Sequence, residues 1–341
     1  MNLKRPLLLP FSPIYWLITF VRNKFFDWGI LKSQTFNTPV INIGNLNVGG
    51  TGKTPHTQWI VGLLKADNKV AVLSRGYGRK TKGFLLANEK STAAEIGDEP
   101  LETLSRHPEI TLAVCEKRAD GIEELERQEA SPELILLDDA YQHRYVKPGL
   151  NILLTAYADL FADDLILPAG NLRESKAGKE RADIIIVTKC PEQLAEAKKE
   201  TISEKLKLSS TQTLGFSNFK YGSPINLKGE EQELPGYFIL VTGIAQTDYL
   251  LDYLNQKDSQ FHHVAFKDHH NFSTKDYAQI FESCNGLGTN KILTTSKDSM
   301  RLDHQLLKEN NIEVLQLPIE VNFLSGKENI EAKIKEFVSV K

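Results

Sequence analysis

One stretch of the sequence has the residue types and spacing of a nucleotide phosphate-binding loop. A glycine-rich segment ending in Lys53 and Thr54 follows an apolar run at residues 39–43 and precedes a segment with helical periodicity at residues 55–64. Glycines let successive backbone N–H groups converge on an anion, and the N-terminus of a helix adds partial positive charge. Lys53 would reach the β and γ phosphates, and the Thr54 hydroxyl would ligate Mg²⁺. The predicted loop consists of Asn47, Val48, Gly49, Gly50, Thr51, Gly52, Lys53 and Thr54.

The loop departs from the strict phosphate-binding pattern at Asn47, where that pattern has glycine. Gly49 and Gly50 would supply the flexibility instead. The alternative is a glycine-rich turn that binds nothing. A strand before the loop and a helix after it favour the nucleotide site.

A second motif supplies carboxylates for a metal ion. The apolar residues 134–137 lead directly into Asp138 and Asp139. A buried strand that delivers a carboxylate to Mg²⁺ has this pattern, and it is expected downstream of a phosphate loop. We therefore predict that Thr54, Asp138 and Asp139 hold Mg²⁺ beside the nucleotide.

Two further segments contain charged groups near predicted strand or helix ends. Arg75, Tyr77 and Arg79 follow the apolar run 69–73 on a glycine-rich turn, where an open α/β sheet binds ligands. A plain turn is the alternative. Asp98 and Glu99 lie at a predicted helix start. Carboxylates there commonly have only a structural role, because their negative charge interacts favourably with the helix dipole.

The N-terminal segment, residues 1–32, is rich in aromatic and basic residues. Residues 14–31 predict a helix with Thr19, Arg22, Asn23 and Asp27 on one face. The apolar run 7–21 is shorter than the roughly 20 residues that span a bilayer and contains proline. We expect a helix lying on a membrane surface, with docking on the protein core and a signal peptide as alternatives.

Composition and strand spacing indicate two α/β units of a protein from a reducing compartment. The net charge of −3 gives no support for nucleic-acid binding, and three distant cysteines provide no disulfide framework. Strands alternate with helices in both halves, which predicts largely parallel sheets. We divide the chain into a membrane-associating helix at 1–32, a phosphate-loop domain at 33–210, a linker at 211–235 and a second, smaller α/β domain at 236–341.

Taken together, the motifs resemble one family. Residues 44–55, 74–79, 97–100, 138–144, 168–174 and 268–270 occur in the order and with the residues of tetraacyldisaccharide 4'-kinase, the lipid A pathway kinase of Gram-negative bacteria. The resemblance implies transfer of the ATP γ-phosphate, with Mg²⁺, to the 4'-hydroxyl of tetraacyldisaccharide 1-phosphate. It implies two α/β/α domains with the active site between them. It also implies a peripheral position on the cytoplasmic face of the inner membrane, and we predict no obligatory protein partner.

The resemblance also suggests roles for individual residues. Asp98 would be the base, assisted by His269 rather than His270, and Lys53 would hold the transferred phosphate. Candidate contacts to the lipid substrate are Arg75, Tyr77, Arg79, Arg118, Gln142, His143, Asn171 and Glu174.

Two rival classes share the phosphate loop. A membrane-associated switch ATPase of the septum- and chromosome-positioning type has a lysine directly before its Gly-Gly pair, where this chain has Val48. A metal-insertion GTPase needs a guanine-reading motif, and Thr188-Lys189-Cys190 lacks its asparagine and aspartate. Both readings are therefore weaker than the kinase.

Overall fold

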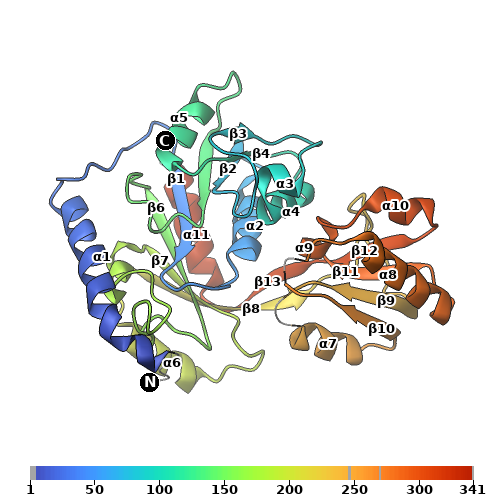
Figure 1. Ribbon diagram of the computed structural model, residues 1–341. Coiled ribbons are helices and arrows are strands. Elements are labelled where there is room, and N and C mark those ends of the chain that lie inside the picture. Colours follow the sequence, from blue (N-terminus) through green and yellow to red (C-terminus); the bar gives the residue numbers. More distant parts are fainter. Residues whose placement is uncertain (1–4, 245–246, 269, 340–341) are drawn as a thin grey trace.

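The larger of two β-sheets carries the predicted phosphate loop. The computed structural model describes residues 5–244, 247–268 and 270–339, and within them this sheet has nine strands in the order β13-β8-β7-β6-β1-β5-β2-β4-β3 (Figure 1). Neighbouring strands are parallel except for the edge pairs β13–β8 and β3–β4. The strands are β1 (Val40–Asn45), β2 (Val70–Ser74), β3 (Leu85–Leu86), β4 (Thr111–Val114), β5 (Leu134–Asp138), β6 (Leu150–Ala156), β7 (Ile184–Thr188), β8 (Thr213–Tyr221) and β13 (Ile319–Ser325).

Helices cover both faces of this sheet, so its central strands are buried on both sides, as parallel sheets require. On one face, α2 (Lys53–Leu64), α4 (Asp98–Arg106) and α11 (Lys327–Ser339) pack against the strands. On the other face, α5 (Arg118–Glu126) and α6 (Glu196–Leu206) do so. The short helices α3 (Ala93–Ile96) and η2 (Lys176–Arg181), the latter a 3₁₀ helix, lie in the connections.

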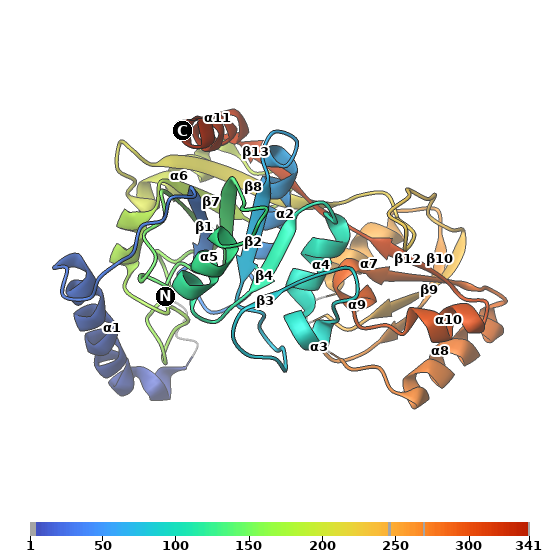
Figure 2. The ribbon, with the colours of Figure 1, turned by 90° about the horizontal axis from the view of Figure 1, so that it is seen from above.

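The smaller sheet is parallel throughout and has the order β10-β9-β11-β12. Helix α7 (Asp248–Asn255) packs on one face, and α8 (Thr274–Leu287) and α10 (His304–Glu309) on the other. Its strands are β9 (Tyr237–Thr242), β10 (Gln260–Ala265), β11 (Lys291–Thr295) and β12 (Glu313–Leu317). The short helix α9 (Ser296–Ser299) follows β11 and contacts α4 of the larger unit (Figure 2). The predicted fold class, two α/β/α units, is confirmed.

Strands β8 and β13 carry the chain out of the larger unit and back into it (Figure 1). The predicted linker 211–235 therefore contains a strand of the large sheet, and the predicted second domain 236–341 contains both β13 and α11. Ile330, Ile334 and Val338 of α11 lie in the hydrophobic core beneath that sheet. The sequence division was wrong at these segments, because the pairing of β13 with β8 joins residues far apart in the chain.

The N-terminal helix α1 (Ser12–Asp27) lies along the side of the larger unit, preceded by the 3₁₀ helix η1 (Pro6–Phe11) (Figure 1). Ser12, Tyr15, Arg22 and Asn23 contact the larger unit, whereas most of the apolar side chains are exposed. Ile14, Leu17 and Ile18 are 60%, 53% and 63% exposed. A helix that merely docks on a core has the opposite orientation. No helix among the described residues combines the length and apolar character needed to cross a membrane.

Candidate active site

The predicted phosphate loop follows β1 and opens directly into α2. Asn45, the last residue of β1, donates from Nδ2 to the Gly49 carbonyl oxygen (3.2 Å) and to Thr51 Oγ1 (3.0 Å). The Thr188 hydroxyl, at the end of β7, donates to the Thr51 carbonyl oxygen (2.8 Å). The loop is thus fastened at several points before any ligand binds, and this rigidity favours anion binding by its backbone N–H groups.

Gly52 has a role that another residue could not fill. Its φ is +82°, and a Cβ there would lie 2.3 Å from the ring of Phe219 on β8. The next turn of α2 is held by His56, which is fully buried. Its Nδ1–H donates to the Gly52 carbonyl oxygen (2.8 Å), so Nε2 accepts from the Ser217 hydroxyl (3.1 Å). Burial lowers the pKa of His56 to about 4, which keeps the ring neutral at physiological pH.

Lys53 extends from the start of α2 toward the acidic pair at the end of β5. Its Nζ lies 3.7 Å from Oδ1 of Asp139, and its side chain is 11% exposed. Asp139 also accepts from Nη1 of Arg173 (3.2 Å). The ammonium group therefore lies between the loop and a carboxylate, where a bound phosphate would compete with Asp139 for it.

Asp138 is buried at the end of β5, facing the first turns of α2. It accepts from the hydroxyls of Thr57 (3.1 Å) and Ser74 (3.4 Å). Burial, together with the nearby carboxylates of Glu99 and Asp139, raises the pKa of Asp138 to about 6. Gathering negative charge in this way is unfavourable unless a cation is close by. Lys53 supplies one such charge, and a divalent ion would supply more.

The residues of the basic loop have different roles. Arg79 is an internal strut, because its guanidinium donates to Glu116 (2.7 Å) and to the Gly83 carbonyl oxygen (2.7 Å), with 3% of its side chain exposed. Arg75 and Tyr77, by contrast, are exposed, Tyr77 at 81%. The structure thus leaves Arg75 and Tyr77 accessible to a substrate, whereas Arg79 shapes the loop.

Arg118 is 1% exposed and binds backbone oxygens. It donates to the carbonyls of Cys115 (2.7 Å) and Asp138 (3.2 Å), and burial lowers its pKa to about 10. In the described conformation it supports the Asp138 backbone instead of facing outward. Burial and the nearby arginines, Arg118 and Arg75, lower the pKa of His143 to about 4.

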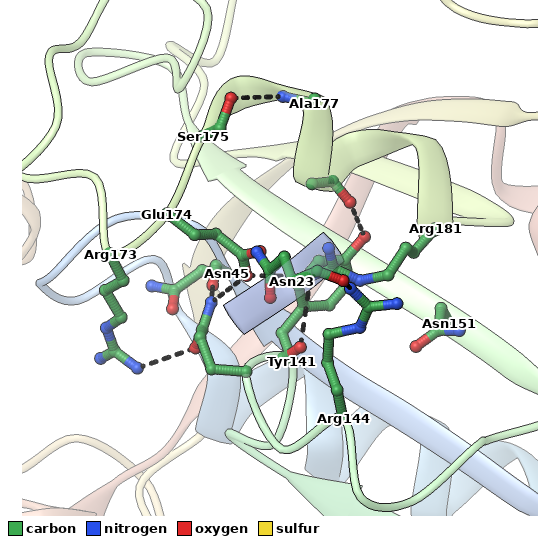
Figure 3. Close-up of polar contacts among 12 residues, drawn as sticks. Asn23, Asn45, Tyr141, Arg144, Asn151, Arg173, Glu174, Ser175, Ala177 and Arg181 are labelled. Atoms are coloured by element: carbon green, nitrogen blue, oxygen red, sulfur yellow. Dashed lines mark hydrogen bonds and ion pairs between the residues drawn. The ribbon is translucent and has the colours of Figure 1, made fainter. Parts of the chain in front are cut away.

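Glu174 is the centre of a buried polar cluster that includes the N-terminal helix (Figure 3). Its carboxylate accepts from Asn23 on α1 (2.8 Å), Gln142 (3.1 Å) and Arg181 (2.9 Å). Gln142 also donates to the carbonyl oxygen of Asn45 (2.9 Å), so this cluster reaches the base of the phosphate loop. Glu174 and Gln142 thus join α1 to the loop.

Asn171 contributes through its backbone. Its carbonyl oxygen accepts from the N–H of Val48 (2.7 Å), and its own N–H donates to Asp164 (3.2 Å). The Asn47 side chain donates to the same carboxylate (3.0 Å). Asn47 is thus buried in a loop-anchoring contact, which explains why glycine is not needed there.

Asp98 is the first residue of α4, at the border between the two units. Gly97 before it has φ +93°, and a Cβ there would lie 2.9 Å from the Tyr77 carbonyl oxygen. Asp98 Oδ2 lies 3.7 Å from Nε of Arg301, which belongs to the smaller unit. His269 lies outside the described residues. His270 binds Asp276 (3.0 Å), whose carboxylate also caps the start of α8.

Three side chains near the site were not predicted from the sequence. Arg173 pairs with Asp139, and Arg301 faces Asp98. Lys189, after β7, has φ +55°, and its Nζ lies 3.8 Å from the position that a Cβ on Gly50 would occupy. Arg173 lies within the motif 168–174, and Lys189 lies in the segment 188–190, which lacks the asparagine and aspartate of a guanine-reading motif. No sequence motif described above includes Arg301.

Comparison with known proteins decides the family. The sequence model of the tetraacyldisaccharide-1-P 4'-kinase (LpxK) family matches residues 4–339. The chain belongs to this family. A tetraacyldisaccharide 4'-kinase of Flavobacterium johnsoniae is 44% identical, with 99% of this chain and 98% of that protein covered. One from Bacteroides thetaiotaomicron is 47% identical, with 94% and 90% covered.

A solved structure of the same family has the same fold. The LpxK of Aquifex aeolicus, determined in complex with ATP, superposes with a TM-score of 0.78 at 29% identity, covering 98% of this chain and 99% of that chain. The family indicated by the motifs is thereby confirmed, and the switch ATPase reading finds no support among these relatives.

Proposed function

We propose that this chain transfers the γ-phosphate of ATP to the 4'-hydroxyl of tetraacyldisaccharide 1-phosphate, the kinase step of lipid A synthesis. The observation that carries the proposal is the placement of Lys53 between the phosphate loop and Asp139, 3.7 Å from its carboxylate, in a member of the LpxK family. A lysine held there is free to exchange a carboxylate for a phosphate without a change of fold.

The donor groups fit a nucleotide with Mg²⁺. No cluster of three or more metal-binding His, Cys, Asp or Glu side chains occurs in the part of the chain that the structure describes. Mg²⁺ does not need one, because it is usually bound by one or two carboxylates and by substrate phosphates. Thr54 and Asp138 would hold the ion, with Asp139 beside them. When bound, Mg²⁺ neutralises charge on the phosphates.

The acceptor hydroxyl needs a base, and we assign that role to Asp98. The hydroxyl oxygen forms a bond to the γ-phosphorus while the bond from that phosphorus to the bridging oxygen of ADP breaks. The hydroxyl proton passes to the Asp98 carboxylate. Arg75 and Tyr77, exposed on the loop against which Gly97 packs, would contact the anionic sugar.

Closure of the two units would complete the site. Asp98 belongs to the larger unit and Arg301 to the smaller, and α4 contacts α9 at the border. Strands β8 and β13 are the connections that would bend. We therefore assign the phosphate loop and Asp98 to one domain, residues 33–221 with 319–339, and the closing surface to the region 222–318.

We infer the direction in which the nucleotide lies from the order of strands. Asp138 ends β5, on one side of β1, and Lys189 follows β7, on the other side beyond β6. If the reacting phosphate faces Asp138 and Asp98, the nucleoside half extends toward Lys189. The ammonium group above Gly50 would then bind the phosphate nearest the ribose.

Replacing Lys189 with methionine is expected to raise KM for ATP about 10-fold and to change kcat less than about 2-fold, because a charge-assisted hydrogen bond to a bound phosphate is lost. Steady-state kinetics with varied ATP would measure this. Lys198→Met, at an exposed position on α6, is the matched control. An unchanged KM for ATP would contradict the placement of the nucleoside half near Lys189.

We further propose that α1 binds the surface of the membrane that holds the lipid substrate. Its outward face and η1 present exposed apolar side chains, which would enter the headgroup region. These side chains are Leu7, Leu9, Phe11, Ile14, Trp16, Leu17, Ile18, Phe20 and Val21. The inward face is polar: Tyr15 donates to the Arg173 carbonyl oxygen (3.0 Å) and Arg22 to that of Gln142 (3.1 Å). We assign the cytoplasmic face of the inner membrane, where ATP is available.

The double variant Ile14→Glu, Ile18→Glu is expected to lower binding to phosphatidylethanolamine–phosphatidylglycerol vesicles about 100-fold, since each residue loses the burial of an apolar side chain. Sedimentation with vesicles would measure it. Leu227→Glu replaces an exposed leucine (48%) outside α1 and is the control. Equal binding by wild type and double variant would contradict the membrane proposal.

The kinase proposal itself is tested with γ-labelled ATP, Mg²⁺ and tetraacyldisaccharide 1-phosphate in detergent micelles. Label moving to the lipid supports it. Hydrolysis of ATP stimulated by lipid vesicles, with no labelled lipid, would instead support the switch ATPase.

A further inference from the structure

Arg301 is held rigidly within the smaller unit. Only 5% of its side chain is exposed. Its Nη2 donates to the Asp298 carboxylate and to the Gly243 carbonyl oxygen (3.3 Å), and its Nη1 donates to the His270 carbonyl oxygen (3.5 Å). Asp298 is itself fully buried and accepts from the Gly243 N–H (2.9 Å) and the Thr295 hydroxyl (2.8 Å). The guanidinium plane therefore has a fixed orientation.

The Nε–H of this guanidinium faces the other unit. Arg301 Nε is buried and has no hydrogen-bond partner among the residues described, and Asp98 Oδ2 lies 3.7 Å from it. A hydrogen bond between these groups forms at about 3 Å. A buried donor without a partner is unfavourable, so a small approach of the two units would be favoured by forming this bond.

Another arginine on α4 makes an ordinary contact within the larger unit and provides a comparison. Arg106, at the other end of α4, donates to the Ile319 carbonyl oxygen (3.0 Å) and lies 3.4 Å from Glu320. Its side chain is 30% exposed and faces β13. Arg301 differs because it is more deeply buried and is aimed at a carboxylate in the candidate site.

We propose that Arg301 is a positioning residue for Asp98. On closure of the two units, its Nε–H binds Oδ2 of Asp98 and leaves Oδ1 directed at the acceptor hydroxyl. Because Asp298 balances the charge of Arg301, the effect on Asp98 is mainly one of orientation. This inference rests on the proposed kinase function and on the role of Asp98 as base.

The experiment compares Arg301→Gln and Arg301→Lys with Arg106→Gln in the full-length protein, using labelled ATP and tetraacyldisaccharide 1-phosphate. We expect kcat to fall about 10- to 100-fold in Arg301→Gln, as is usual for a misplaced catalytic group, with KM for ATP within about 2-fold of wild type. Arg301→Lys keeps the charge but lacks the Nε–H at that position, so it should also lose kcat. Arg106→Gln should remain close to wild type.

A double-mutant comparison separates positioning from structural support. In an Asp98→Asn background, Arg301→Gln should change kcat less than about 2-fold, because the group on which it acts has been removed. An equal, additive loss in that background would overturn the proposal, as would wild-type kcat in both Arg301 variants. If Arg301→Gln fails to fold, the same comparison with Arg301→Lys decides. A wild-type protein that labels no lipid would instead contradict the kinase function.

Discussion

Asp98→Asn is expected to lower kcat for lipid phosphorylation by about 10²- to 10⁴-fold, the usual contribution of a general base. Asparagine has nearly the same shape as aspartate but cannot accept the hydroxyl proton. KM for ATP should stay within about 2-fold, because the phosphate loop and Lys53 do not depend on this carboxylate. Initial rates with labelled ATP, measured at saturating lipid and ATP, would give the comparison.

The same substitution distinguishes catalysis from a role at the helix start. Asp98 is in the first turn of α4, so its negative charge also stabilises the helix by interacting with the helix dipole. Loss of that contribution costs about 0.3–1 kcal/mol of stability, and a purely structural aspartate would leave kcat unchanged. Asp120→Asn, in the first turn of α5, is the matched control. Equal kcat in both variants would remove Asp98 from the chemistry.

The parts of the site that the sequence predicted are those built from contiguous residues. The phosphate loop, its flanking strand and helix, and the strand ending in Asp138 are short local patterns with a fixed geometry. A buried parallel strand is a continuous apolar run, so β1, β2, β5 and β7 could be recognised individually. Their order in the sheet required the structure.

The roles of two arginines depend on partners that the sequence pattern does not indicate. The family resemblance implies that Arg79 and Arg118 contact substrate, yet Arg79 pairs with Glu116 and Arg118 binds the Asp138 carbonyl oxygen. A guanidinium has several donors and serves equally well as a structural strut or a ligand contact. Nothing in the local sequence distinguishes the two uses.

Non-local packing also explains the missed C-terminal elements. β13 has partly buried side chains, and its pairing with β8 joins Ile319 to Tyr221. Helix α11 buries Ile330, Ile334 and Val338 against strands formed much earlier in the chain. The sequence pattern of an amphipathic helix shows that one face is buried, but not which sheet covers it.

The orientation of α1 shows a related limit. The sequence predicts its polar positions and a helix lying on a membrane surface, but not the partners of the polar face. Here Asn23 binds the buried carboxylate of Glu174, and Asp27 binds Arg144 (2.8 Å). These partners lie beyond residue 140, so the contacts that hold the polar face inward are seen only in the folded structure.

Lys53→Met is expected to lower kcat/KM for ATP by about 10³-fold, because one preorganised positive charge facing the transferred phosphate is removed. Methionine keeps the length and the apolar stem of the side chain. The fold should persist, since Asp139 retains its pairing with Arg173 at 3.2 Å. Thermal unfolding would verify the fold, and labelled-ATP kinetics would measure the loss.

A second lysine associated with the same helix provides the control. Lys65, just after the last residue of α2, pairs with Glu109 and lies at the opposite end from the loop. Lys65→Met removes the same charge from the protein, so both variants have the same net charge and differ in where it is lost. If both lost activity equally, the effect would come from general electrostatics or from α2 itself. A loss confined to Lys53→Met would place the reacting phosphate at the N-terminus of α2, where the loop, Asp138 and Asp139 converge.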